Sequence, residues 1–147
     1  MDEIDKKIVL LLQEEARISM TELGKSVSLS QPAVTERVRR MEEKGIIDSY
    51  RAVVSPEKIN KQITAYVLIH TKGCESFVEH CKQADEVVEL HRISGQYNFL
   101  VKVVTENLQT LEMATNQMGV YGDSTTLIVL SSPIKNDKLV PIILNKN

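Results

Sequence analysis

The sequence predicts an α+β protein in two parts, a helical N-terminal domain over residues 1–54 and a C-terminal domain over residues 62–147, joined by a linker at 55–61. Three observations predict this division. Apolar residues recur with the 3.6-residue period of helices up to about residue 47. From residue 63 onward, strand-like and helical runs follow the order βαββαβ. Between the two parts, Ser55-Pro56 ends the first pattern as a turn would.

The composition excludes several classes of protein. The formal net charge of −2 over 147 residues excludes a polycationic nucleic-acid coat, so any DNA binding is local and repeated through oligomerisation. No apolar run is long enough to span a bilayer, and the acidic start MDEIDKK is unlike a signal peptide, so we expect no membrane partner and a cytoplasmic protein. The spacing of Cys74 and Cys81 indicates neither a disulfide framework nor a zinc site. We therefore expect no metal and no cofactor.

Three helices are predicted in the first part. Residues 2–15 place an apolar stripe on one side of the first helix, formed by Ile4, Ile8, Leu11 and Leu12. The second helix is short and follows Ser19, whose spacing to Glu22 is that of a capping box. The third follows Ser30 as N-cap and ends at Lys44-Gly45, a cationic last turn and a left-handed stop. These helices predict a three-helix unit.

The third helix has two different sides. Val34, Val38 and Met41 fall on one stripe, which we expect to be buried. At roughly 100° per residue, the opposite side displays Gln31, Pro32, Thr35, Glu36, Arg39 and Arg40. Two short helices joined by a three-residue turn, the second exposing polar donors and arginines, are typical of a helix-turn-helix that lays a helix in the DNA major groove. The alternative is an ordinary solvated face, because residues 17–51 carry seven basic against five acidic residues.

Residues 46–54 are β-rich and short, so we expect them to form the wing that follows many such motifs. Arg51 in this segment is a candidate phosphate contact, although an ordinary surface arginine explains it equally well. Together these features predict a winged helix-turn-helix.

The second part is predicted to be a ferredoxin-like βαββαβ domain. Its strands are expected at 63–71, 87–93, 97–104 and 125–130, and its helices at 75–84 and 107–118, with Ser94-Gly95-Gln96 as a hairpin turn. Both helices would cover one face of an antiparallel sheet. The other face is also rich in apolar residues, which favours a dimer with sheets facing each other. The apolar segment 139–144 is expected at that interface or along a sheet edge.

The two parts together resemble the Lrp/AsnC family of transcription regulators over essentially the whole chain. The residues that carry the resemblance, in order, are Asp5-x-x-Ile8, Arg17-Ile18-Ser19, Glu22-Leu23, Leu29-Ser30, Val34, Arg37-Val38, Arg40-x-Glu42, Gly45-Ile46-Ile47 and Ser94-Gly95-x-Tyr97. The resemblance implies a sequence-specific DNA-binding regulator modulated by a small molecule such as an amino acid. It also implies homodimers that assemble into octamers or related rings on double-stranded DNA. By position, Gln31 and Thr35 would touch base edges, and Arg39 and Arg40 phosphates or guanine.

In this family the effector binds between dimers, near the turn that joins the middle strands. By position this site maps onto His91, Gly95, Gln96, Tyr97, Asn98 and Leu108, with Leu127, Ile128 and Val129 as neighbours. The chain departs from the family pattern here, because family members commonly carry an acidic residue at the position of Asn98 and often one at the position of Gln96. A carboxylate could pair with an α-ammonium group, whereas an amide can only form hydrogen bonds with it. Two interpretations remain, an amino-acid site and a tight turn in a subunit interface.

An enzyme is the main alternative from another class. The sequence contains no phosphate-binding glycine motif, no nucleophile elbow and no H-E-x-x-H zinc motif, so we predict no catalytic residues. The siroheme decarboxylases share the overall architecture and would use histidine and arginine, for which His91 and Arg92 are candidates. An architectural DNA-binding protein without an effector is the other alternative.

Overall fold

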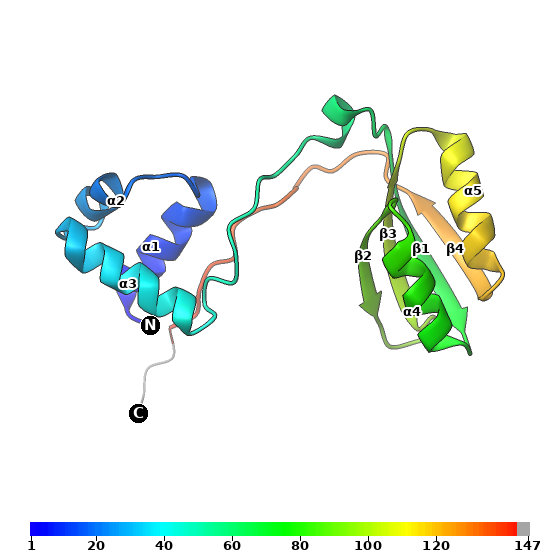
Figure 1. Ribbon diagram of the computed structural model, residues 1–147, viewed down its shortest axis with the longest axis horizontal. Coiled ribbons are helices and arrows are strands. Elements are labelled where there is room, and N and C mark those ends of the chain that lie inside the picture. The colour runs from blue at the N-terminus through cyan, green and yellow to red at the C-terminus, as the bar shows by residue number, and fades with distance from the viewer. Residues whose placement is uncertain (144–147) are drawn as a thin grey trace. The chain divides into compact units, whose positions relative to one another are not determined.

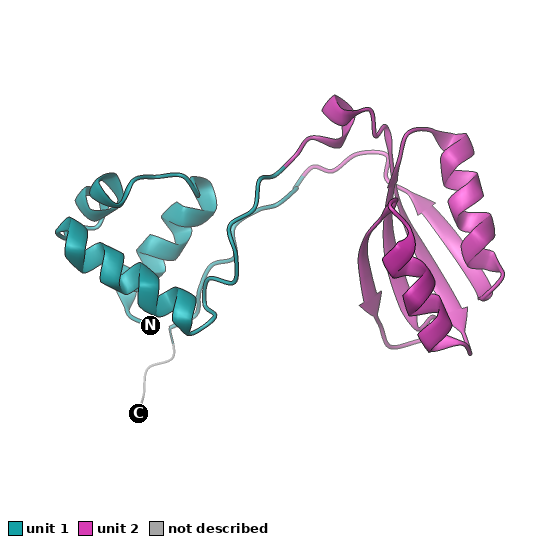
Figure 2. Ribbon diagram, viewed as in Figure 1, with its two compact units in different colours: residues 1–53, 134–147 teal, residues 54–133 magenta. Residues whose placement is uncertain are grey.

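The computed structural model describes residues 1–143 and confirms the predicted α+β class (Figure 1). The chain divides into two compact units (Figure 2). Unit 1 comprises residues 1–53 together with residues 134–143, and unit 2 comprises residues 54–133. The sequence places residues 134–143 with the second domain, whereas their contacts group them with unit 1, and the bounds of the two domains stay a prediction. None of the helices in the described residues has the length and apolar character needed to cross a bilayer.

Unit 1 contains the three predicted helices, α1 (Glu3–Glu14), α2 (Met20–Ser26) and α3 (Gln31–Glu43). Asp2, Ser19 and Ser30 cap their N-termini by accepting backbone amide hydrogens. The caps at Asp2 and Ser19 are reciprocated by Asp5 and Glu22, so the predicted capping box at Ser19 is confirmed. The three apolar stripes meet in one core, formed by Ile8, Leu12, Leu23, Val27, Val34, Val38 and Met41.

The turn between α2 and α3 is tight, and Leu29 can approach Gly24 because glycine has no side chain. The Leu29 amide donates to the Gly24 carbonyl at 2.8 Å, which folds the chain back onto the end of α2. A Cβ atom at Gly24 would lie 2.7 Å from the Leu29 carbonyl oxygen. Ser28 supplies the reversal with a positive φ of 58°. This contact therefore sets the direction in which α3 leaves the turn.

The segment after α3 differs from the prediction of a wing strand at 46–54. Among the described residues, none between α3 and the first strand of unit 2 is in a β-strand, and Pro56–Ile59 forms a single 3₁₀ turn (η1) within the predicted linker. A β-rich composition gives only a preference for extended backbone. A strand also needs a neighbour that pairs with its amides and carbonyls, and residues 46–54 have none in this structure.

The C-terminal segment returns to α1. The Gln13 side chain donates from Nε2 to the Leu139 carbonyl at 2.9 Å and accepts the Leu139 amide at Oε1 at 2.8 Å. The Lys138 ammonium also pairs with the Glu14 carboxylate. The described part of the segment predicted at a dimer interface or sheet edge thus lies against α1. The glutamine amide offers the donor and acceptor that an extended backbone otherwise finds in a strand. Leu144 lies outside the described residues.

Unit 2 has the predicted order of elements. They are β1 (Ile63–Thr71), α4 (Cys74–Gln83), β2 (Val87–Arg92), β3 (Phe99–Thr105), α5 (Leu108–Gly119) and β4 (Gly122–Ile128). The four strands form one antiparallel sheet in the order β2-β3-β1-β4, as in a ferredoxin-like domain. The last strand runs from 122 to 128, earlier than the predicted 125–130.

The two faces of the sheet differ. Helices α4 and α5 cover one face, as Figure 1 shows, and the core beneath them includes Val67, Phe77, Val101 and Met118. The opposite face, which we call the open face, carries the cross-strand pairs Tyr66–Lys102, Tyr66–Leu127 and Leu68–Leu100. Leu127 is 49% exposed there. Within the described residues no helix covers the open face, so it combines apolar side chains with exposure.

Candidate DNA-binding interface and effector loop

Helix α3 presents the predicted DNA-facing residues on one exposed side. Gln31 and Pro32 form its first turn, and the Thr35 hydroxyl donates to the Gln31 carbonyl at 2.8 Å. Glu36, Arg39 and Arg40 follow, with side chains that are 51, 54 and 52% exposed. The other side of α3 buries Val34, Val38 and Met41 in the core. The core thus fixes the helix while the polar side remains accessible.

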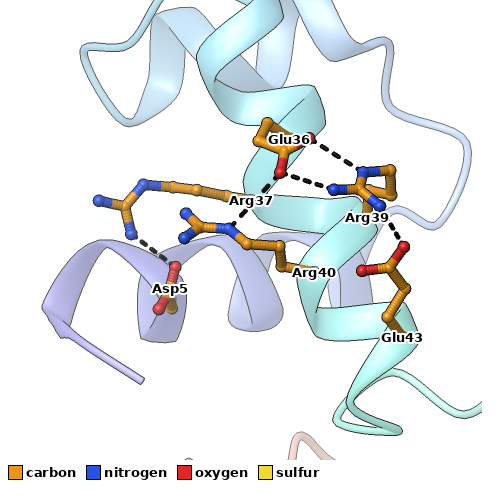
Figure 3. Close-up of polar contacts among 6 residues, drawn as sticks. All are labelled: Asp5, Glu36, Arg37, Arg39, Arg40 and Glu43. Atoms are coloured by element: carbon orange, nitrogen blue, oxygen red, sulfur yellow. Dashed lines mark hydrogen bonds and ion pairs between the residues drawn. The ribbon is translucent and has the colours of Figure 1, made fainter.

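Two carboxylates surround the Arg39 guanidinium (Figure 3). Its Nε donates to Glu36 Oε2 at 2.9 Å and its Nη2 to Glu36 Oε1 at 2.8 Å, while Nη1 donates to Glu43. The Arg40 Nε lies 3.9 Å from the same Glu36 carboxylate. The hydrogen bonds that Arg39 donates to Glu36 hold the pKa of Glu36 below its usual value and raise the pKa of Arg39. Both groups are therefore charged at neutral pH.

Arg37 on the same helix has a different role. Its Nη1 lies 2.8 Å from an Asp2 oxygen and 2.7 Å from an Asp5 oxygen at the start of α1. These hydrogen bonds raise the pKa of Arg37, and its side chain is only 22% exposed. Arg37 therefore links α3 to α1. The sequence offers only the acidic start of the chain as a signal for this pairing, because it does not say which arginine those carboxylates meet.

Arg51 is exposed in the irregular segment after α3. Its contact with phosphate stays a prediction. Glu43 was not among the predicted site residues, although it holds Arg39. Its spacing of four residues from Arg39 is the signal that could have identified it.

The hairpin between β2 and β3, which we call the effector loop (residues 93–98), is tied to the neighbouring strands. The His70 Nδ1 lies 3.0 Å from the Gln96 carbonyl oxygen, and the Tyr97 hydroxyl lies 2.7 Å from Thr125 Oγ1. Gly95 has a φ of +110°, and no atom lies within 4 Å of where its Cβ would be. The loop therefore has an anchored base and an open tip at Gly95 and Gln96.

Asn98 turns its amide toward β1. Its Oδ1 accepts the Thr71 amide at 3.0 Å, and its Nδ2 donates to the Thr71 carbonyl at 2.7 Å. Cys74 Sγ at the start of α4 is a further neighbour of Nδ2, at 3.8 Å. Asn98 thus uses both ends of its amide to join the effector loop to the end of β1. The sequence maps this residue onto an effector contact, and the structure gives it a role in positioning the loop.

The remaining predicted effector residues do not gather around the loop within one copy of the chain. The loop lies at the Thr71 end of β1, where the Asn98 amide donates to the Ile69 carbonyl. Leu127, Ile128 and Val129 lie beside Tyr66, Ala65 and Thr64, and α5 begins with Leu108 beyond the β3 residue that pairs with Ile63. At roughly 3.3 Å per residue along a strand, residues 127–129 lie about 10–17 Å from Ile69 along the sheet, and the start of α5 lies about 20 Å from it. His91 pairs with Leu100 nearer the loop.

Replacing Asn98 by alanine is expected to lower the free energy of unfolding of unit 2 by about 1–3 kcal/mol, because the Thr71 amide and carbonyl lose their partner in a half-buried setting. Urea unfolding followed by circular dichroism measures this loss. Gln96→Ala is the matched control, since the Gln96 contact to His70 uses only its backbone carbonyl. Equal stability of the two variants would contradict the assigned role of Asn98.

Two family models match the chain. Residues 1–48 match a model described as winged helix-turn-helix DNA-binding, and residues 64–139 match one described as Lrp/AsnC ligand binding domain. The two matches correspond to the helical and the ferredoxin-like parts of the chain. The first covers α1 to α3, and the second covers β1 to β4 apart from Ile63, the first residue of β1.

Relatives match over nearly the full length. The uncharacterized HTH-type transcriptional regulator YezC of Bacillus subtilis is 44% identical over 132 residues, covering 90% of this chain and 95% of the relative. The solved structure of LrpC from B. subtilis superimposes with a TM-score of 0.86 at 31% identity, covering 90% of this chain and 96% of that one. The transcriptional regulator NMB0573 from Neisseria meningitidis, solved in complex with L-Met, has the same fold, with a TM-score of 0.86 at 24% identity over 92% of this chain and 93% of that one.

Proposed function

Because the chain belongs to the Lrp/AsnC family of transcription regulators, we propose that it reads its operator with the exposed side of α3 in the major groove of DNA. Gln31 and Thr35 would meet base edges, and Arg39 and Arg40 would meet guanine or phosphate. Pro32 and Glu36 lie on the same side, and Arg51 would add a phosphate contact from the neighbouring segment. The proposed domain that does this is residues 1–54.

One observation carries this proposal. The buried stripe of α3 fixes the helix against α1 and α2, while two arginines and the N-terminal turn on its other side are exposed. The helix contains three arginines and three glutamates, so these side chains carry no net positive charge that would attract DNA. Affinity must therefore come from specific placement of the arginines and from repeated sites in an oligomer.

Purified protein mixed with fragmented genomic DNA tests the proposal. We expect the retained fragments to share a sequence motif with approximate twofold symmetry, because a symmetric dimer presents two copies of α3. Retention without any shared motif would favour an architectural DNA-binding protein instead. No retention at low salt would contradict DNA binding through α3.

A small molecule, such as an amino acid, is proposed to bind at the effector loop between copies of the chain. Gly95 and Gln96 leave the tip of the loop open, which supports binding there. Leu108 and residues 127–129 lie at the far end of the sheet. The complete site would therefore combine the loop of one copy with that far end of another. Without an acidic residue at position 98, the ligand's α-ammonium group would be held by carbonyl and amide oxygens.

Calorimetry with the twenty amino acids tests this site. L-Met is a sensible first ligand, because the N. meningitidis protein of the same fold holds it. We expect heat of binding for at least one amino acid, together with a change in assembly seen by sedimentation. If no amino acid gives heat or alters assembly, the loop serves only as a turn in a subunit interface.

The open face is proposed to pair two copies into a dimer, with dimers joining into an octamer or related ring. Its partly exposed apolar side chains support this pairing, since burying them is worth roughly 25 cal/mol per Å². Sedimentation at micromolar concentration is expected to show no monomer. We further propose that the protein acts in the cytoplasm and is not an enzyme. Binding of siroheme, seen as colour on purification, would overturn the second point.

A further inference from the structure

Glu36 contacts both exposed arginines of α3. In the structure, Arg39 directs two of its guanidinium nitrogens to Glu36 and a third to Glu43 (Figure 3). Glu36 also lies 3.9 Å from Arg40, so one carboxylate neighbours both predicted DNA-contacting arginines. A phosphate or guanine that approaches Arg39 must displace this carboxylate, because the bidentate geometry that Glu36 occupies is the one these DNA groups use.

We infer that Glu36 is a specificity-determining residue, which weakens binding to DNA in general and weakens it least where a cytosine amino group faces it. This inference rests on the proposed role of α3. On arbitrary DNA only phosphates are available to Arg39, and the released Glu36 carboxylate is left among like charges. On the operator, the N4 amino group of cytosine is a major-groove donor that glutamate accepts. Glu36 then gains a partner as it releases Arg39.

The Glu36→Gln variant tests the inference with the full-length chain. The variant is expected to bind a duplex of arbitrary sequence about two- to fivefold more tightly, the range that a surface ion pair of up to about 1 kcal/mol allows. Its affinity should also fall more steeply with salt, since Arg39 becomes available for one more phosphate contact. Affinity for a fragment retained from the genome should rise less, so the ratio of specific to arbitrary binding should fall.

Glu42→Gln is the matched control. It removes the same charge from the same helix, and Glu42 accepts from the Tyr50 hydroxyl at 2.8 Å, a bond that a glutamine oxygen can also accept. Equal gains in arbitrary binding for the two variants would mean that only net charge matters, which would overturn the inference.

A double variant separates displacement from simple repulsion. If Glu36 acts through Arg39, Glu36→Gln should have little effect on arbitrary binding in an Arg39→Ala background. An undiminished gain in that background would contradict the inference. If Arg39→Ala alone does not weaken binding, the proposed role of α3 fails. If Arg39→Ala weakens binding but Glu36→Gln changes nothing, only the inference about Glu36 fails.

Discussion

The double variant Arg39→Ala/Arg40→Ala is expected to lose at least about 30-fold in affinity for the operator, since each arginine that contacts a guanine is worth roughly 1–3 kcal/mol. Both side chains are more than half exposed, and their described contacts are to Glu36 and Glu43 of the same helix. The fold and the assembly should therefore be unchanged. Fluorescence anisotropy with a labelled fragment measures the affinity, and sedimentation measures the assembly.

Lys72→Ala/Lys82→Ala is the matched control for charge. It removes two positive charges from exposed positions of unit 2, outside the helix-turn-helix. We expect the control to keep its affinity within about threefold, because neither lysine belongs to the helix-turn-helix and each contributes only to the overall charge of the protein. Equal losses in the two variants would mean that the affinity comes from overall charge and not from α3.

Gly24→Ala is expected to destabilise unit 1 by about 1–3 kcal/mol, the usual cost of forcing an extra group into a packed site. The new Cβ would lie 2.7 Å from the Leu29 carbonyl oxygen, a backbone atom that cannot move without shifting the turn. Because that turn sets the direction of α3, operator affinity should fall as well. Urea unfolding and anisotropy measure the two effects.

Gly119→Ala is the control for Gly24→Ala. Gly119 is the last residue of α5, and no atom lies within 4 Å of its missing Cβ. Alanine is a better helix former than glycine, so this substitution should be neutral or slightly stabilising. If Gly24→Ala were as stable as Gly119→Ala, the turn would have more room than the structure gives it.

Local signals in the sequence were sufficient for most of the fold. Ser19 with Glu22, and Ser30 alone, mark helix starts by chemistry that acts within one turn. The stripe of Val34, Val38 and Met41 likewise identifies the buried side of α3, and hence the exposed side. The ferredoxin-like order of strands and helices follows from periodicity in each segment.

The errors concern contacts between residues distant in sequence. The predicted wing strand at 46–54 lacks a pairing partner, and Gln13 binds the backbone of Leu139, 126 residues later. Asn98 similarly reaches back to Thr71. Composition and spacing contain no information on these partners, so the sequence could place the residues in their elements but could not say what they touch.

The candidate site shows the same limit. The exposed residues of α3 were predictable because helical geometry alone determines them. The spacing of Glu36 and Arg39 on one helix allows an ion pair between them. Spacing does not determine whether the Arg39 side chain forms that ion pair or is solvated, because this depends on side-chain conformations. For the effector site, a list of residues mapped by position proved to come from two ends of one sheet.

A photocrosslinking side chain placed at Thr35 tests most directly whether α3 lies in the groove. Irradiation of the full-length protein on a retained genomic fragment should link position 35 to DNA, whereas the same side chain at Glu112, exposed on α5, should not. Crosslinks from position 35 to another protein copy, with none to DNA, would show that this surface is covered by protein and would contradict the account.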